Sequence, residues 1–350
     1  MHLKRMICVG AAVFGVSAST AIASASASTI NEAGSSLIYP LAAIWGIHYT
    51  GASVKTNPGG SGIGIKDISA NAYTVDIGAS DAPMSPTQYA GDSHTPIEIP
   101  WGLTATGIGY NIPGVKAGLK INATILAGIY TGKITTWNNK AILNLNKPFR
   151  KALLKAGKIT PIFRSDGSGD SFAFQNFLYR GAPKVWKTAP STTFPNTVGQ
   201  GENGNAGVAA EVHANHGTIG YISAAYLIQQ HITVAMVQNA AGNYEFPNGK
   251  NIAAAAASNS KIPAQGTAFT NANGVPIQYP AKKYKFAYPI STYTYAIVNQ
   301  HPVSGSAPTA DLQAFLNWAI TTGQAFGGPL DFVRLPKAIV NQDKALISSL

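Results

Sequence analysis

Cysteine and carboxylate side chains are both scarce in this 350-residue sequence. The one cysteine, Cys8, lies in an apolar run near the N-terminus, so the rest of the chain has no thiol for a disulfide or for cysteine chemistry. Only 14 aspartates and glutamates oppose 25 lysines and arginines, and the formal net charge is +11. Few carboxylates are expected in a protein that works in an acidic exterior, where such groups would titrate. Each remaining acid is therefore informative.

Several signatures of catalysis and of nucleic-acid binding are also absent. No serine lies in a G-x-S-x-G elbow, so a hydrolase would lack its nucleophile motif. The basic residues are dispersed along the chain, whereas a nucleic-acid binder would cluster them with stacking aromatics. His213 and His216 have a spacing that favours a surface helix end over a metal site. We therefore predict no cofactor, no metal, no nucleic-acid partner and no enzymatic activity.

The first 27 residues have the pattern of a cleaved secretory signal peptide. Lys4 and Arg5 precede an apolar core over residues 6–16, and small residues follow up to Ala27. The apolar core is too short to span a bilayer as a stable anchor. Loss of the two basic residues lowers the net charge from +11 to +9. Export of a chain that is then free of cysteine indicates a bacterial periplasmic protein.

The most informative stretch is a glycine-rich turn over residues 164–171. An apolar run before it reads as a strand, and after it apolar residues recur at helical spacing. Gly167 and Gly169 allow the backbone to turn tightly, and Ser168 can cap the helix. Free N–H groups at a helix start form an anion site, to which Arg164 adds a planar donor. The alternative interpretation is an ordinary capped loop with a surface arginine.

Two more serine-bearing segments precede predicted helices. Ser35 and Ser36 come before a helix from about residue 39, and Ser61 lies at a glycine-rich entry after a strand over residues 53–56. A strand over residues 73–80 ends near Asp81, which either caps a turn or accepts a hydrogen bond from a protonated oxyanion. Residues 124–137 are predicted to be helical, and residues 253–257 to belong to a variable excursion. Strands that alternate with helices indicate an α/β architecture.

Together these segments resemble the periplasmic phosphate-binding proteins of high-affinity phosphate ABC transporters. The resemblance extends from about residue 33 to residue 336 and rests on motifs in the family's order. They are Ala33-Gly34-Ser35-Ser36, Gly60-Ser61-Gly62, residues 77–83 (IGASDAP), residues 111–114 (NIPG), residues 129–137 (IYTGKITTW), the turn at Arg164, and Ile219-Gly220-Tyr221.

The resemblance implies an α/β, two-lobed periplasmic-binding-protein fold of type II-like form, with a ligand cleft between lobes joined by crossing strands. Residues 28–106 plus 289–350 would form lobe I, and residues 107–288 lobe II. A monomer that passes inorganic phosphate to membrane permease and ATPase subunits is implied as well. By position, the phosphate ligands are Ser36, Leu37 through its N–H, Ser61, Asp81, Arg164, Ser168, Gly169 and Asp170, with Asp166 orienting the arginine.

Two positions depart from the family pattern. Leu37 stands where an aromatic residue is common, which is harmless if only its N–H binds. Asp170 stands where some members have threonine, so it offers either its backbone N–H or a second acceptor for a protonated oxygen. Two other functions stay open on the sequence. They are a receptor for another tetrahedral oxyanion, such as sulfate, and a secreted phosphoester hydrolase.

Overall fold

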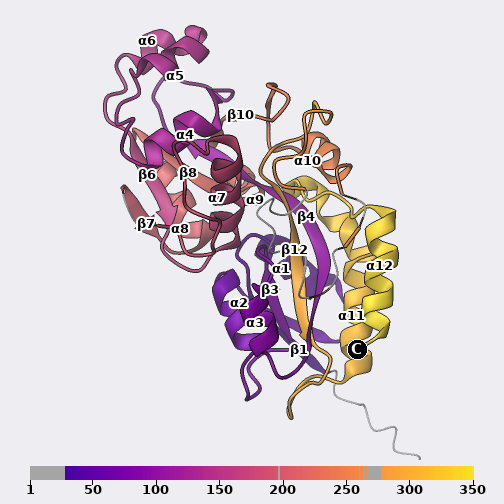
Figure 1. Cartoon of the computed structure of the whole chain (residues 1–350). Helices are drawn as coiled ribbons and strands as arrows, with labels where there is room; N and C mark the ends of the chain where they lie inside the picture. Colours follow the sequence, from indigo (N-terminus) through magenta and orange to yellow (C-terminus); the bar gives the residue numbers. More distant parts are fainter. Residues whose placement is uncertain (1–27, 196–197, 260, 263–264, 266–276) are drawn as a thin grey trace, which may run out of the picture.

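The computed structural model describes residues 28–195, 198–259, 261–262, 265 and 277–350. The predicted signal peptide lies outside these ranges. Two groups of elements lie on either side of a central strand pair (Figure 1). One continuous path of hydrogen-bonded strands, β2-β1-β3-β12-β4-β8-β6-β7, passes through both groups. The two-lobed α/β fold predicted from the sequence is therefore confirmed.

The first lobe is built on the half of the sheet that holds both ends of the described chain. Its strands are β1 (Thr29–Gly34), β2 (Ser53–Asn57), β3 (Ile77–Ser80), the first part of β4 (Pro96–Tyr110) and β12 (Ser291–Asn299). The first three are parallel, and β12 is antiparallel to β3 and β4. Its helices are α1 (Tyr39–His48), α2 (Ser61–Ile68), α3 (Pro86–Gly91), α11 (Thr309–Ala319) and α12 (Lys337–Ser348), with the 3-10 turns η2 (Thr322–Phe326) and η3 (Gly328–Leu330).

The second lobe continues from the end of β4. Strands β8 (Thr218–Ser223), β6 (Thr160–Arg164) and β7 (Gln200–Glu202) follow in space, and β9 (Thr233–Val234) also pairs with β4. Around them lie α4 (Ala123–Tyr130), α5 (Lys140–Leu145), η1 (Lys147–Phe149), α6 (Arg150–Leu153), α7 (Gly169–Gly181), α8 (Gly204–Ala214) and α9 (Ala224–Gln229). Helix α10 (Gly249–Ala256) packs against the central strands β4 and β12. A small separate sheet joins β11 (Tyr244–Glu245), β10 (Met236–Gln238) and β5 (Lys120–Ile121).

Strand β4 belongs to both lobes. All of its residues are buried, and it pairs with β12 in one lobe and with β8 in the other. Its ladder with β12 shifts register between Thr294 and Tyr295. The lobe boundary predicted after residue 106 falls inside this strand, which runs on to Tyr110, and remains a prediction.

Two local expectations were wrong. The third strand begins only at Ile77, because Asp76 is turned inward and accepts from the N–H groups of Asn31 and Ala307. The helix expected over residues 124–137 ends at Tyr130, and Gly132 then adopts a positive φ of 72°. Residues 253–256 of the predicted excursion lie in α10, where Ala255 and Ala256 are buried, and its variability stays a prediction. Residues 266–274, which the sequence assigns to the same excursion, lie outside the described residues.

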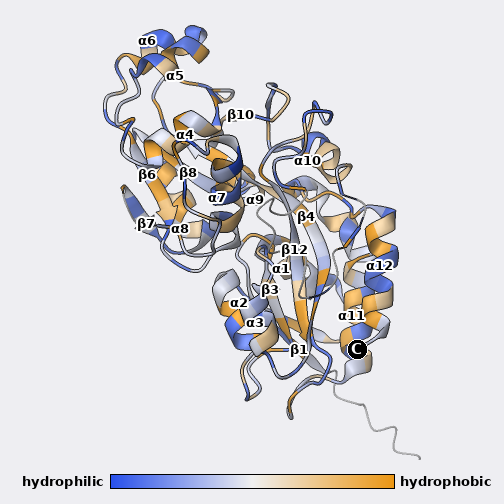
Figure 2. Ribbon diagram, viewed as in Figure 1, coloured by the Kyte–Doolittle hydropathy of each residue, from blue (hydrophilic) through white to orange (hydrophobic). Residues whose placement is uncertain are grey.

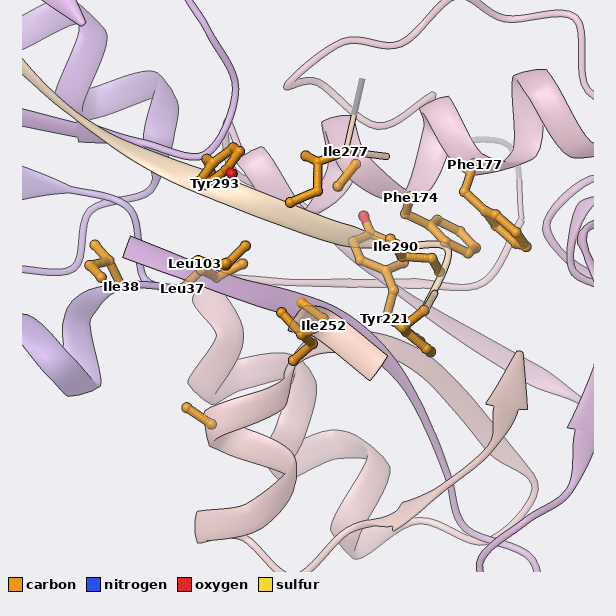
Figure 3. Packing of buried hydrophobic residues seen from close by; sticks show 14 of the residues in the cluster. Leu37, Ile38, Leu103, Phe174, Phe177, Tyr221, Ile252, Ile277, Ile290 and Tyr293 are labelled. Atoms are coloured by element: carbon orange, nitrogen blue, oxygen red, sulfur yellow. The ribbon is translucent and has the colours of Figure 1, made fainter. Parts of the chain in front are cut away.

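The main hydrophobic core runs through both lobes. Figure 3 shows Leu37, Ile38 and Leu103 on one side and Phe174, Phe177 and Tyr221 on the other, along β4 and β12. Strands β6 and β8 are largely apolar in Figure 2, as expected of strands that are covered on both faces. Within the described part of the chain, no helix combines the length and apolarity needed to cross a membrane.

Candidate anion-binding site between the lobes

Arg164 is the last residue of β6 and is 1% exposed. Its backbone N–H donates to the Tyr221 hydroxyl over 2.9 Å, and that hydroxyl lies 2.7 Å from Ser171 Oγ at the start of α7. The ring of Tyr221 stacks on Phe174 with ring centroids 4.6 Å apart. The aromatic core under α7 therefore fixes the point at which the arginine side chain leaves the sheet.

The guanidinium of Arg164 contacts two carboxylates. Nε donates to Asp166 Oδ1 over 2.7 Å, and Nη2 is paired with Asp166 Oδ2. Nη1 donates to Asp170 Oδ2 over 3.1 Å. Burial works against the charge, but the bonds to Asp166 raise the pKa of Arg164. Asp166 therefore holds the guanidinium by a two-pronged contact, and its role in orienting Arg164 toward a ligand stays a prediction.

Asp170, in the first turn of α7, is fully buried and well supplied with donors. Oδ1 accepts from Thr106 Oγ1 over 2.6 Å, and Oδ2 accepts from Asn205 Nδ2 over 2.6 Å as well as from Arg164. Burial raises the pKa of Asp170, although Arg164 counteracts this. The carboxylate itself, and not only the backbone of Asp170, therefore belongs to the cluster.

The segment before α1 approaches the same cluster from the first lobe. Ser36 Oγ accepts from both the N–H and Nδ2 of Asn205, over 3.2 and 3.0 Å. The N–H of Leu37 donates to Ser35 Oγ over 3.0 Å. Asn205 thus joins Ser36 in one lobe to Asp170 in the other.

Ser61, the first residue of α2, connects the remaining groups. Its Oγ donates to Asp81 Oδ2 over 3.3 Å and accepts the N–H groups of Asp81 and Gly169, each over 3.1 Å. A Cβ on Gly169 would lie 2.5 Å from Asp81 Cβ, so this position requires glycine. Gly62 N–H also donates to the carbonyl oxygen of Gly167 over 2.8 Å. The lobes therefore meet through glycines on two glycine-rich turns.

Asp81 is 1% exposed and lies at the polar end of β3. Ser35 Oγ lies 2.6 Å from each of its carboxylate oxygens. Burial and the nearby charge of Asp170 raise the pKa of Asp81 to about 7. In contrast, the bonds from Arg164 outweigh burial and lower the pKa of Asp166. The contacts with Arg164 therefore favour the ionised form of Asp166, whereas burial disfavours the ionised forms of Asp81 and Asp170.

The structure brings the eight predicted phosphate ligands to one buried region between the lobes, and half-buried Asp166 lies beside them against Arg164. Ser168 contributes as the N-cap of α7, where its Oγ accepts from Ser171 N–H over 3.3 Å. Thr106 and Asn205 were not predicted from the sequence, and Tyr221 was assigned no role of its own. Ser35 was considered as an anion donor with Ser36 but was not among the predicted ligands, and in the structure it contacts Asp81. Asn205 is the second residue of α8, directly after Gly204, so a fourth glycine-marked helix start with a polar residue was the available signal. Thr106 gave none, because it lies within an apolar strand.

The site offers an anion positive helix ends, serine hydroxyls and a guanidinium. Ser61 and Gly169 begin helices, where the backbone dipoles favour negative charge. Three of the five guanidinium N–H groups bond to Asp166 and Asp170, which leaves two for a ligand among the described contacts. The described residues hold no cluster of three or more histidine, cysteine, aspartate or glutamate side chains arranged for a metal.

Comparison with known proteins is consistent with this geometry. Residues 19–322 match the PBP superfamily domain. The phosphate-binding protein PstS of Pasteurella multocida is 33% identical over 91% of this chain and 90% of the relative, and that of Xylella fastidiosa strain 9a5c is 32% identical over 91% and 85%. A high-affinity periplasmic phosphate-binding protein (PfluDING), solved with bound phosphate, shares the fold with a TM-score of 0.68 and 22% identity, over 91% of this chain and 93% of the other.

Proposed function

We propose, because this chain belongs to the PstS phosphate-binding protein family of the PBP superfamily, that it captures inorganic phosphate between its two lobes and delivers it to an ABC transporter. The observation that carries the proposal is the meeting of Arg164, Asp81 and two helix N-termini in one buried region. The membrane permease and ATPase subunits of that transporter would be its partners. We further propose that the chain acts as a monomeric binding protein, without catalysis, in the periplasm after cleavage of residues 1–27.

The proposed ligand set is the one predicted from the sequence. Ser36, Ser61 and Ser168 would contribute hydroxyls, Leu37 and Gly169 backbone N–H groups, Arg164 its charge and Asp81 an acceptor, and Asp170 would contribute either its backbone N–H or its carboxylate. Support comes from their common burial and from the bonds that join Ser61, Asp81 and Gly169. Lobe closure is favoured by contacts made only in the closed state, such as that of Gly62 N–H with Gly167.

Asp81 supplies the chemical basis for choosing phosphate over sulfate. A ligand that carries a proton can donate it to an ionised carboxylate there, which phosphate does near neutrality and sulfate does not. Sulfate would instead place a charged oxygen against this buried carboxylate, at a cost of at least about 1–3 kcal/mol. Micromolar binding corresponds to about −8 kcal/mol, so a cost of this size decides selectivity.

The proposal is tested by calorimetric titration of the ligand-stripped mature protein with phosphate and, separately, with sulfate near pH 8, about one unit above the pKa of Asp81. Tight phosphate binding without sulfate heat supports it. Binding of both anions would favour a receptor for tetrahedral oxyanions in general, and absence of phosphate binding would overturn the proposal. Turnover of a phosphoester with a catalytic rate would favour the hydrolase alternative.

A further inference from the structure

Two carboxylates, not one, belong to the buried cluster proposed as the anion site. Asp81 approaches from β3 in the first lobe and Asp170 from α7 in the second, and both side chains are almost completely buried. They are linked by a short chain of bonds. Asp81 Oδ2 accepts from Ser61 Oγ, which accepts from the N–H of Gly169, the residue before Asp170. A ligand that contacts the start of α7 therefore lies within reach of both.

Asp170 keeps acceptor capacity after its protein contacts are counted. A carboxylate has about four lone-pair directions. Those of Asp170 receive Thr106 Oγ1, Arg164 Nη1 and Asn205 Nδ2, over 2.6, 3.1 and 2.6 Å. One direction is left for a ligand, and only an O–H can use it without repulsion between negative charges.

One ligand proton cannot satisfy two carboxylates. Monohydrogen phosphate would donate its single O–H to Asp81 or to Asp170 and would turn a charged oxygen toward the other. The one guanidinium in contact with these groups, that of Arg164, is already shared with Asp166. A second proton removes the remaining contact between like charges, which is costly in a buried site.

We propose that the closed complex holds two protons shared among phosphate, Asp81 and Asp170, so that the species captured is dihydrogen phosphate. This inference rests on the proposed function and extends it to the protonation state of the ligand. Asp170 is then a specificity-determining residue, since threonine at this position would offer a hydroxyl and require only one proton in the complex.

The charged and titratable groups around Asp170 do not obscure this proton count. Arg164 from β6 and Asp166 from the turn keep their charges, because their mutual contact stabilises both ionised forms. Tyr221 from β8 and Tyr226 from α9 remain neutral, because burial raises both pKa values, that of Tyr226 to about 12. Thr106 and Asn205 carry no charge. Glu32 faces Asp81, and burial raises its pKa. Glu32 is present in the unmodified protein and in both Asp170 variants compared below, so its contribution cancels.

The experiment is phosphate titration of the mature protein by calorimetry in two buffers of different ionisation enthalpy, near pH 8.5, where free phosphate carries one proton. We expect uptake of about one proton per phosphate bound and a Kd that rises about tenfold per pH unit in this range. The Asp170→Thr variant should take up about no protons and show a nearly level Kd. Asp170→Asn gives the same comparison if the threonine variant does not fold.

The outcomes separate this inference from the proposed function. Phosphate binding by the unmodified protein with no proton uptake would overturn the inference and leave phosphate capture intact. Proton uptake that persists in both Asp170 variants would also overturn it, because the second proton would then reside elsewhere. Absence of phosphate binding at any pH would overturn the proposed function itself.

Discussion

The backbone N–H of Gly169 donates to Ser61 Oγ over 3.1 Å, so the first turns of α7 and α2 share one hydroxyl across the two lobes. The same hydroxyl donates to Asp81. The Ser61 side chain thus couples the approach of the two lobes to the orientation of the Asp81 carboxylate, which we propose accepts the ligand's proton.

The close packing at Gly169 predicts that a single methyl group blocks closure. In Gly169→Ala the new Cβ would lie 2.5 Å from Asp81 Cβ. Overpacking of this kind costs about 1–3 kcal/mol, so phosphate affinity should fall about tenfold to a hundredfold. Gly91→Ala is the control, since a Cβ at that glycine meets no atom within 4 Å. Equal affinities for the two variants by calorimetry would contradict this account of closure.

Replacement of the acceptor should remove the discrimination against sulfate. Asp81→Asn supplies an amide that can donate to a fully deprotonated oxyanion, so sulfate affinity should rise relative to phosphate affinity. Competition titrations at pH 8 measure the ratio. Asp67→Asn, in the last turn of α2, is the matched control. An unchanged ratio in Asp81→Asn would exclude the acceptor role.

The raised pKa of Asp81, about 7, gives sulfate discrimination a pH dependence. Above that value the carboxylate is ionised and repels sulfate. Below it the group is neutral and can donate, so the penalty on sulfate is lost as the pH falls. Sulfate titrations between about pH 5 and 8 should show affinity that increases toward acid and levels off. Sulfate affinity that is independent of pH, or that grows toward alkaline pH, would be incompatible with this ionisation.

Asn205 should contribute to affinity although it was not predicted as a ligand. Its side chain bonds Ser36 and Asp170 and accepts from Ser223 N–H over 2.7 Å. Asn205→Ala leaves buried groups unpaired, which costs about 1–3 kcal/mol and should weaken phosphate binding about tenfold or more. Asn215→Ala, at the exposed end of the same helix, is the control. Identical binding by both would show that the bridge between the lobes is dispensable.

Buried carboxyl groups outside the site predict greater stability in acid. Burial raises the pKa of Asp343 to about 9 and of Glu98 to about 8. Both bind a proton in the folded state at pH values where the unfolded chain has lost it, so stability falls as pH rises from about 4 to these values, by up to about 1.4 kcal/mol per unit for each group. Asp166 has the opposite effect, because its lowered pKa contributes stability that is lost as the pH falls through that pKa.

Thermal unfolding of the unmodified protein and of Asp343→Asn measures this effect. The substitution should raise the melting temperature at pH 8 more than at pH 5, because the Asp343 carboxyl oxygens have no hydrogen-bond partner among the described residues. Asp311→Asn in α11 serves as the control. A melting temperature of the unmodified protein that collapses below about pH 5 would count against adaptation to an acidic exterior.

The helix starts of the site could be predicted from the sequence, whereas the long-range contacts that join them could not. Ser61 and Ser168 are each flanked by glycines, and Ser36 shortly precedes Pro40 in the first turn of α1, so these helix starts have local signals. Asn205 and Thr106 reach the site only because β4 and β8 pair within the folded sheet. The inward turn of Asp76 likewise depends on Ala307, which is 231 residues away in the chain. Contacts of this range leave no periodic pattern in a single sequence.

The irregularity in the β4–β12 ladder has a mechanical consequence. These strands carry the chain between the lobes, and every residue of β4 is buried, so the connection is a stiff two-stranded ribbon and not a flexible tether. The register shift at Thr294 and Tyr295 bends the ribbon inside the first lobe, where Tyr295 also pairs with Ser80 of β3. We therefore expect the rotation axis for opening to pass beyond this bend, near Ser291 and Ala105, where the β4–β12 ladder ends at the second lobe.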